Sequence, residues 1–284
     1  MKRIGVVGCG LMGSGIAEVA AGAGAQVIAI EMDDVALDRG RERVEKSLAR
    51  AVSSLKMTEE DAVRIRGSLT FSTDLADLAD REMVIEAIAE NEALKLDVFR
   101  RIDEAVTDPL AILATNTSSI PIITVGMATK RPEQVVGMHF FNPVPVLRLV
   151  EVISSLRTSP ETTARTIDYA RDVLQKKVIT SPDRAGFVVN ALLIPYLLSA
   201  IRMFEAGYAS AEDIDTGMVE GCAHPMGPLA LTDLIGLDTT LAVAQSLYEE
   251  FKEPHFAPPP LLSRMTAAGL LGRKSGEGFF SYRK

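Results

Sequence analysis

Short, almost continuously apolar runs alternate with helical patterns over the first two thirds of the chain. Several of these runs are too apolar to be half-exposed strands, and strands buried on both faces belong to a sheet that is covered by helices. The pattern predicts an α/β fold of the Rossmann type, with a doubly wound, mostly parallel sheet. The predicted strands are RIGVV, QVIAI, LTFST, MVIEAI, AILAT, VVGMHFF, LRLVEVI and KVITS, with Ser159 as the N-cap of the helix that precedes the last one.

The alternation stops after Asp183. Residues 185 to about 270 contain only long apolar segments at helical spacing, which are broken by glycine and proline. This pattern predicts an all-helical domain appended to the α/β domain. The boundary is expected in SPDRAG, so that residues 1–183 form the first domain and residues 184–284 form the second.

Composition narrows the classes of function. The 284 residues carry a formal net charge of -8, which argues against a broad nucleic-acid or anionic-membrane surface. Two cysteines are too few for a disulfide framework and fit a reducing compartment. No apolar signal segment precedes the first glycine loop, and the longest apolar stretch, residues 185–201, is shorter than the roughly 20 residues of a membrane span. We expect a cytoplasmic protein.

A glycine-rich motif, GCGLMG, follows the first predicted strand and opens a helix of small residues. Glycines at this spacing allow a tight turn in which backbone N–H groups approach a pyrophosphate at the positive end of the helix. The alternative is a tight turn that binds no ligand. The candidate cofactor-binding residues here are Gly8, Gly10, Leu11, Met12 and Gly13.

Glu31 ends the second predicted strand, at the distance from the glycines where an acidic side chain accepts hydrogen bonds from both ribose hydroxyls. Its carboxylate would repel a 2′-phosphate, so the sequence favours NAD over NADP. Taken alone, Glu31 is equally well explained as a solvated charge at the end of a strand.

Proton transfer to or from an alcohol near neutral pH is best served by histidine, and the chain has three. His255 lies in a polar, proline-rich stretch and is expected at the surface, and His224 precedes a proline in a predicted turn between helices. His139 lies at the end of an apolar strand, where the carboxyl ends of a doubly wound sheet face the ligand crevice. A lone buried histidine is more often structural than catalytic.

Glu151 favours the catalytic interpretation of His139. The loop NPVPV lets the next strand return beside the previous one, which brings the carboxylate within reach of the imidazole. A carboxylate on one ring nitrogen fixes the tautomer and leaves the other nitrogen free to exchange a proton. TNTSS, residues 115–119, and Asn190 are further polar candidates, although hydroxyls after a strand are ordinarily helix caps.

Six motifs in the same order, ATNTSSI, GMHFFNPVPV, LVEVI, GFVVN, HPMGP and LGRKSGEGFF, resemble those of the short-chain L-3-hydroxyacyl-CoA dehydrogenases. The resemblance runs from end to end of the chain. It implies NAD(H) as the cofactor and no catalytic metal. The implied reaction interconverts 3-hydroxyacyl-CoA and 3-oxoacyl-CoA esters such as acetoacetyl-CoA, in a homodimer built largely through the helical domain.

The resemblance also implies roles for individual residues. His139 is the expected acid/base and Glu151 its orienting partner, while Ser118 is expected to bond the substrate oxygen and Asn190 to place the thioester end. Asn142 is expected to contact the cofactor or the substrate. The further cofactor contacts implied are Glu90, Lys95, Asn116 and Lys274.

One segment departs from the family pattern. Where family members often carry a lysine pair that meets the CoA phosphates, this chain has Ser53 and Ser54. The surrounding segment nevertheless has an excess of cations, and we expect Lys56 and Arg50 to contact CoA. An ordinary solvated helix face explains these cations as well. Two other functions remain open: a dehydrogenase of a free sugar acid or hydroxy acid, and a non-catalytic NAD-binding protein.

Overall fold

The apolar runs of the first two thirds form one eight-stranded sheet. The computed structural model describes residues 1–283 and divides into Met1–Arg184, the α/β unit, and a helical unit that begins at Ala185. The strand order is β3-β2-β1-β4-β5-β6-β7-β8, and only the β6–β7 pairing is antiparallel. The strands are β1 Arg3–Val7, β2 Gln26–Ile30, β3 Leu69–Ser72, β4 Met83–Glu86, β5 Ile112–Thr115, β6 Val135–Phe140, β7 Leu149–Ser154 and β8 Lys177–Pro182.

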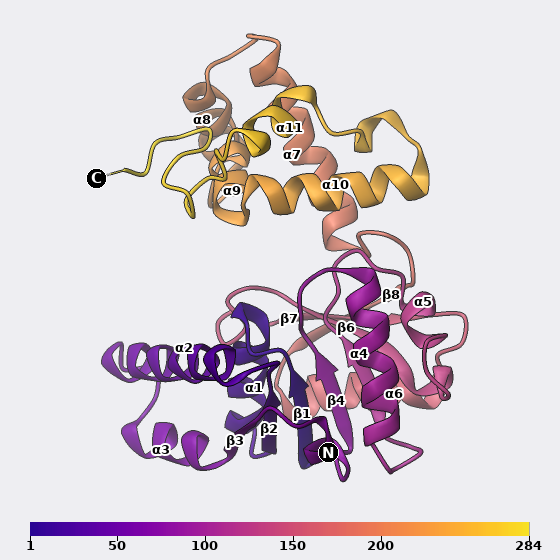
Figure 1. Cartoon of the computed structure of the whole chain (residues 1–284). Helices are drawn as coiled ribbons and strands as arrows, with labels where there is room; N and C mark the ends of the chain where they lie inside the picture. Colours follow the sequence, from indigo (N-terminus) through magenta and orange to yellow (C-terminus); the bar gives the residue numbers. More distant parts are fainter. Residues whose placement is uncertain (284) are drawn as a thin grey trace. The chain divides into compact units, whose positions relative to one another are not determined.

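Each predicted apolar run matches one of these strands to within two residues at either end, and β4, β5 and β6 are buried along their whole length. This burial explains why the central runs lack the polar alternation of a half-exposed strand. The predicted fold class is confirmed. Figure 1 shows the sheet with its helices in the α/β unit, coloured from indigo to pink.

Short polar side chains start most of the helices in the α/β unit. Asp33, Thr58, Asn91 and Ser159 each accept a hydrogen bond from a backbone N–H in the first turn of the helix that follows. The predicted cap at Ser159 is therefore confirmed. The helices are α1 Leu11–Gly22, α2 Asp34–Ser53, α3 Glu59–Gly67, α4 Glu92–Ala105, α5 Ile122–Gly126 and α6 Pro160–Asp168, with α6 continued by a π-helical turn, Tyr169–Val173.

The helical unit has its own core, to which Leu198, Leu229, Leu247 and Leu262 contribute fully buried side chains. No helix among residues 1–283 is both long enough and apolar enough to cross a membrane. Asn190, predicted within a long apolar helix, lies in the first turn of α7 and is half-buried. The helices are α7 Val189–Glu205, α8 Ala211–Cys222, α9 Pro228–Ile235, α10 Leu237–Phe251 and α11 Pro260–Ala267.

Candidate active site

The three glycines at the junction of β1 and α1 have different structural roles. Gly8 has φ +93°, and a Cβ on it would meet the carbonyl oxygen of Ala87 at 2.7 Å. A Cβ on Gly13 would overlap the carbonyl oxygen of Gly8. A Cβ on Gly10, in contrast, would meet no atom of residues 1–283 within 4 Å. Gly8 and Gly13 therefore shape the turn, whereas Gly10 leaves room for a ligand to approach the backbone.

Helix α1 begins directly beside this space. Its N-cap is Gly10, which has no side chain to cap the first N–H groups, and its first turn, starting with Leu11 and Met12, contains no acidic residue. The N-terminus of a helix carries partial positive charge and directs N–H groups outward. The turn is thus suited to a diphosphate.

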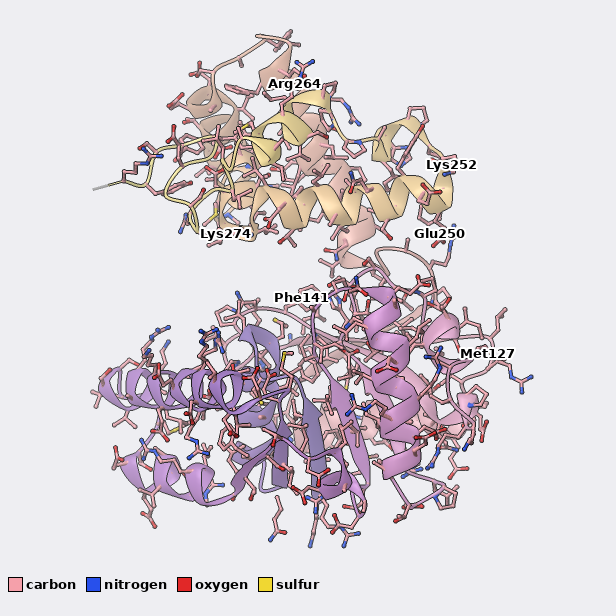
Figure 2. The ribbon with its side chains drawn as sticks, in the orientation of Figure 1. Met127, Phe141, Glu250, Lys252, Arg264 and Lys274 are labelled. Carbon is pink, nitrogen blue, oxygen red and sulfur yellow. The ribbon has the colours of Figure 1, made fainter. Side chains whose placement is uncertain are left out.

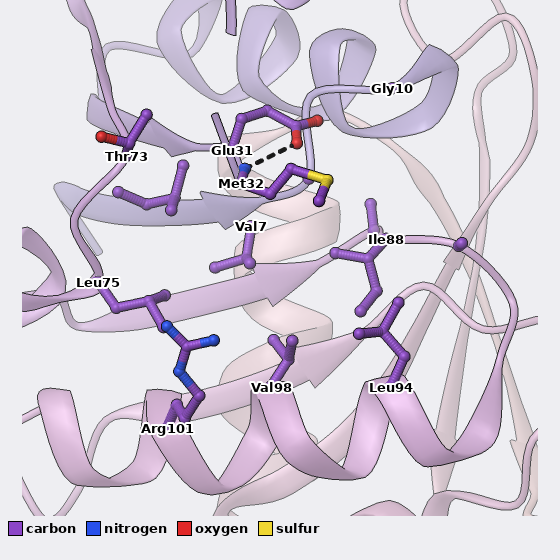
Figure 3. Close-up of a pocket in the computed structure, with 14 residues that line it drawn as sticks. Val7, Gly10, Glu31, Met32, Thr73, Leu75, Ile88, Leu94, Val98 and Arg101 are labelled. Atoms are coloured by element: carbon purple, nitrogen blue, oxygen red, sulfur yellow. Dashed lines mark hydrogen bonds between the residues drawn. The ribbon is translucent and has the colours of Figure 1, made fainter. Parts of the chain in front are cut away.

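A cavity of about 410 Å³ lies next to the glycine turn in the α/β unit. Figure 3 shows Glu31 entering it from the end of β2 and Arg101 from α4 on the opposite side. Most of the wall between them is apolar, which suits the flat face of an aromatic ring. The lining residues include Val7, Ile30, Met32, Leu75, Ile88, Leu94 and Val98.

The carboxylate of Glu31 also holds the turn in shape. Its Oε1 accepts a hydrogen bond from the Cys9 N–H at 2.6 Å, and its Oε2 accepts one from the Met32 N–H at 3.1 Å. Burial, and then the charge of Glu31, raise the pKa of the Cys9 thiol to about 12. Cys9 therefore stays protonated at neutral pH and acts as a small buried side chain.

A histidine and a glutamate face each other across the antiparallel pair β6–β7. The register places His139 directly opposite Glu151, with 2.7 Å between Nδ1 of the imidazole and Oε2 of the carboxylate. Both side chains are buried, His139 at 5% and Glu151 at 0% exposure. The short loop after β6 creates this pairing, since it returns the chain in the register that puts both polar residues on the same face.

The second ring nitrogen of His139 points to the loop after β5. Its Nε2 lies 3.3 Å from the hydroxyl oxygen of Ser118. The imidazole is therefore held between a carboxylate and a hydroxyl. With Nδ1–H donating to Glu151, Nε2 can exchange a proton with an oxygen that lies beside Ser118.

Glu90 fixes the loop that carries Ser118. It accepts hydrogen bonds from the Thr117 hydroxyl at 2.5 Å and from the Ser118 and Ser119 N–H groups at 2.9 and 3.0 Å. Burial raises the pKa of Glu90, but the charge of Lys95 and these hydrogen bonds outweigh burial and leave it below its ordinary value. The Thr117 and Ser119 hydroxyls thus bind a carboxylate and do not cap α5, whose first N–H groups donate to Asp183.

Lys95 connects Glu90 to a second carboxylate, Glu86, at the end of β4. The ammonium lies 2.6 Å from Glu86 and 3.2 Å from Glu90, and Lys95 and Glu86 are 1% and 0% exposed. Thr115 also donates to Glu86, at 2.7 Å. Sequence reasoning missed Glu86, although it carries the same signal as Glu151, a carboxylate inside an apolar strand. It also missed Arg101, and it named Thr117 only as part of TNTSS, without the role of its hydroxyl in organising the loop.

The two asparagines of the predicted site lie in different surroundings. Asn116 Oδ1 accepts a hydrogen bond from the Phe140 N–H at 2.8 Å, which ties the β5 loop to the strand that carries His139. Asn142 is exposed in the loop after β6. Figure 2 labels Phe141, which precedes Asn142, at the edge of the α/β unit.

The remaining predicted residues belong to other segments of the chain. Arg50, in the last turn of α2, and Lys56, just beyond it, are exposed. Asn190 and Lys274 belong to the helical unit, where Lys274 forms an ion pair with Asp238 at 2.5 Å. Figure 2 shows Lys274 in the yellow C-terminal segment.

The other two histidines also belong to the helical unit. His224 follows α8 and lies 3.1 Å from the hydroxyl of Tyr196. His255 is exposed, as expected.

The chain matches two family models over nearly its whole length. Residues 3–184 match "3-hydroxyacyl-CoA dehydrogenase, NAD binding domain", and residues 186–282 match "3-hydroxyacyl-CoA dehydrogenase, C-terminal domain". The chain is also 58% identical over 282 residues to a "3-hydroxybutyryl-CoA dehydrogenase" of Mycobacterium tuberculosis, with 99% of both proteins covered.

Two crystal structures have the same fold. FadB2 of M. tuberculosis superposes with a TM-score of 0.99 at 57% identity, covering 100% of this chain and 99% of that one. The (S)-3-hydroxybutyryl-CoA dehydrogenase PaaH1 of Ralstonia eutropha gives a TM-score of 0.95 at 44% identity, with 100% of both chains covered.

Proposed function

Because the chain belongs to the 3-hydroxyacyl-CoA dehydrogenase family of NAD-dependent oxidoreductases, we propose that it interconverts (S)-3-hydroxybutyryl-CoA and acetoacetyl-CoA. The observation that supports this proposal most is the His139–Glu151 pair, with its 2.7 Å contact, beside the hydroxyl of Ser118. Such a pair can handle the one proton that accompanies oxidation of an alcohol to a ketone.

His139 is the acid/base of the proposed reaction. In the direction of reduction, protonated Nε2 donates its proton to the substrate oxygen, and in the direction of oxidation neutral Nε2 removes it. Glu151 keeps Nδ1 protonated and stabilises the imidazolium. Ser118 donates a hydrogen bond to the same substrate oxygen, which keeps that oxygen within reach of the imidazole.

The α/β unit offers a fitting place for NAD. The space beside Gly10 and the open N-terminus of α1 suit the diphosphate, and Glu31 suits the ribose hydroxyls. When bound, NAD accepts or supplies the hydride. The residues proposed to hold the cofactor are Gly8, Gly10, Leu11, Met12, Gly13, Glu31, Glu90, Lys95, Asn116, Asn142 and Lys274.

The CoA part of the substrate carries phosphates that need cations. Arg50 and Lys56 are exposed near the end of α2 in a chain with net charge -8, and we assign them to these phosphates. Asn190 and Asn142 are assigned to the thioester end. The asparagine assignments rest on the resemblance to the family, whereas those of Arg50 and Lys56 rest on their charge, because Ser53 and Ser54 stand where family members often carry a lysine pair.

A cytoplasmic homodimer is part of the same proposal. The helical unit exposes several large apolar side chains, which a second copy of the chain would cover. These include Leu192 at 73%, Tyr208 at 81% and Leu234 at 49% exposure.

The test is to mix the protein with NADH and acetoacetyl-CoA and to follow the absorbance of the reduced nicotinamide. We expect the absorbance to fall, free CoA to inhibit competitively, and free acetoacetate to be a poor substrate. No oxidation of NADH would refute the proposal. Equal rates with acetoacetate and no inhibition by CoA would instead favour a dehydrogenase of free hydroxy acids.

A further inference from the structure

Lys176 is a buried lysine that the proposed reaction does not use. It lies between the π-helical turn after α6 and strand β8, and it is 8% exposed. Its ammonium donates hydrogen bonds to the carbonyl oxygens of Val144 at 2.6 Å and Leu147 at 2.8 Å. Among residues 1–283, no carboxylate forms an ion pair with it.

This arrangement opposes the ordinary preference of an ammonium group for water. Burial, and then the positive charge of Arg148, lower the pKa of Lys176. A methionine would fill the same volume without the desolvation penalty. The advantage that a lysine offers here is its hydrogen bonds to two carbonyl groups of one loop.

That loop joins the two strands of the proton-transfer pair. Residues 141–148 connect β6, which carries His139, to β7, which carries Glu151. Val144 is 1% exposed, and its Cβ would lie 3.0 Å from a Cβ built on Gly15 of α1. Val144 is thus fixed by α1 through its side chain and by Lys176 through its carbonyl group.

The outer side of the loop is free to meet a ligand. Asn142 is exposed, and the apolar residues Val146 and Leu147 are 62% and 42% exposed. An amide with two neighbouring apolar groups is suited to a short acyl thioester. One side of the loop is therefore anchored in the protein, and the other side is complementary to a short acyl thioester.

We propose that Lys176 is a positioning residue, which holds the loop after β6 so that Asn142, Val146 and Leu147 form a preorganised surface for the acyl thioester. This inference rests on the proposed function. It predicts that loss of the clamp weakens the use of the acyl-CoA substrate far more than the binding of NADH, because Asn142 is the one residue of this loop that is assigned to the cofactor, whereas the glycine turn and Glu31 lie in other segments.

The experiment compares Lys176→Met with Lys177→Met in the full-length protein. Lys177 is the next residue and its side chain is exposed, so its substitution is a matched control. For Lys176→Met we expect amide hydrogen exchange at Val146 and Leu147, whose N–H groups donate to the carbonyl oxygen of Pro143, to accelerate roughly tenfold or more. We also expect the KM for acetoacetyl-CoA to rise about tenfold while the Kd for NADH changes less than about twofold. Lys177→Met should match the wild type in all three measurements.

Unchanged exchange in Lys176→Met, or faster exchange with an unchanged KM, would overturn the proposal. A parallel loss of NADH affinity, turnover and melting temperature would reduce Lys176 to a general structural residue, and would also overturn it. If Lys176→Met does not fold, Lys176→Gln replaces it, since a neutral, shorter amide weakens the clamp but keeps a donor. A wild type that does not oxidise NADH with acetoacetyl-CoA refutes the proposed function instead, which separates the two failures.

Discussion

The cofactor end and the proton-transfer end of the site are built from one sheet by different means. At the cofactor end, the contacts available to a ligand come from backbone shape: a glycine turn, the N-terminus of α1 and a mostly apolar cavity. At the proton-transfer end they come from individual functional groups, which the β6–β7 register and the β5 loop bring together. Cofactor binding should therefore be sensitive to changes in the shape of the backbone turn. Proton transfer should be sensitive to the removal of a single functional group.

The largest effect on the cofactor end is expected from Gly10→Ala. The added methyl group meets no described atom within 4 Å, so the fold should tolerate it, yet it occupies the space assigned to the diphosphate. Crowding of about 1 to 3 kcal/mol corresponds to roughly 5- to 150-fold weaker NADH binding. Fluorescence titration with NADH measures this, and the melting temperature should stay close to that of the wild type.

Gly13→Ala is the contrasting variant, because its methyl group overlaps the carbonyl oxygen of Gly8 within the protein itself. It should lower the melting temperature as well as NADH affinity. If Gly10→Ala bound NADH as tightly as the wild type, the space beside Gly10 would not hold the diphosphate, and the prediction would be contradicted.

A smaller effect on NADH binding is expected from Glu31→Ala. This variant removes one side-chain carboxylate from the cofactor end, where most contacts come from the backbone. Loss of a charged acceptor for the ribose hydroxyls should weaken NADH binding about tenfold. It should also improve the relative binding of NADPH, because the repulsion of the 2′-phosphate is removed. Titration with both dinucleotides measures the ratio, and an unchanged ratio would contradict the assigned role.

The smallest effect on function is expected from Glu18→Gln in α1. Burial raises the pKa of Glu18, with a partial offset from a hydrogen bond to Ser47. A raised pKa in the folded state means that ionisation opposes folding, so wild-type stability falls as pH rises from the ordinary value of 4.5 through the raised one.

Glutamine cannot ionise, and the variant should therefore melt at a higher temperature than the wild type at neutral pH. The difference should vanish below pH 4.5, where both states of the wild type are protonated. NADH affinity should not change. Thermal melts across this pH range test the sign, and a lower melting temperature at neutral pH would contradict it.

The parts of the site that could be predicted from the sequence are those whose residues lie close together along the chain. The glycine spacing and Glu31 are local in sequence, and the family, the NAD cofactor and the oxidoreductase class that the motifs predicted are confirmed by the family matches. His139 and Glu151 could be paired beforehand because one short loop connects their strands. The residue roles stay predictions.

What could not be predicted depends on contacts between distant segments. The cavity wall combines residues after β3 and β4 with residues of α4, including Arg101. The clamp on Val144 comes from Lys176, which is 32 residues away. Glu86 was overlooked because its partners, Lys95 and Thr115, lie on other elements. The spacing of such residues along the chain does not predict that they meet in the folded protein.

The most direct measurement is a pair of values, turnover with acetoacetyl-CoA and Kd for NADH, determined for His139→Gln, with exposed His255→Gln as the matched control. We expect turnover of His139→Gln to fall roughly 10²- to 10⁴-fold, with NADH affinity within about twofold of the wild type. His255→Gln should change neither value. Wild-type turnover in His139→Gln would contradict proton transfer by this imidazole, whatever the glycine turn binds.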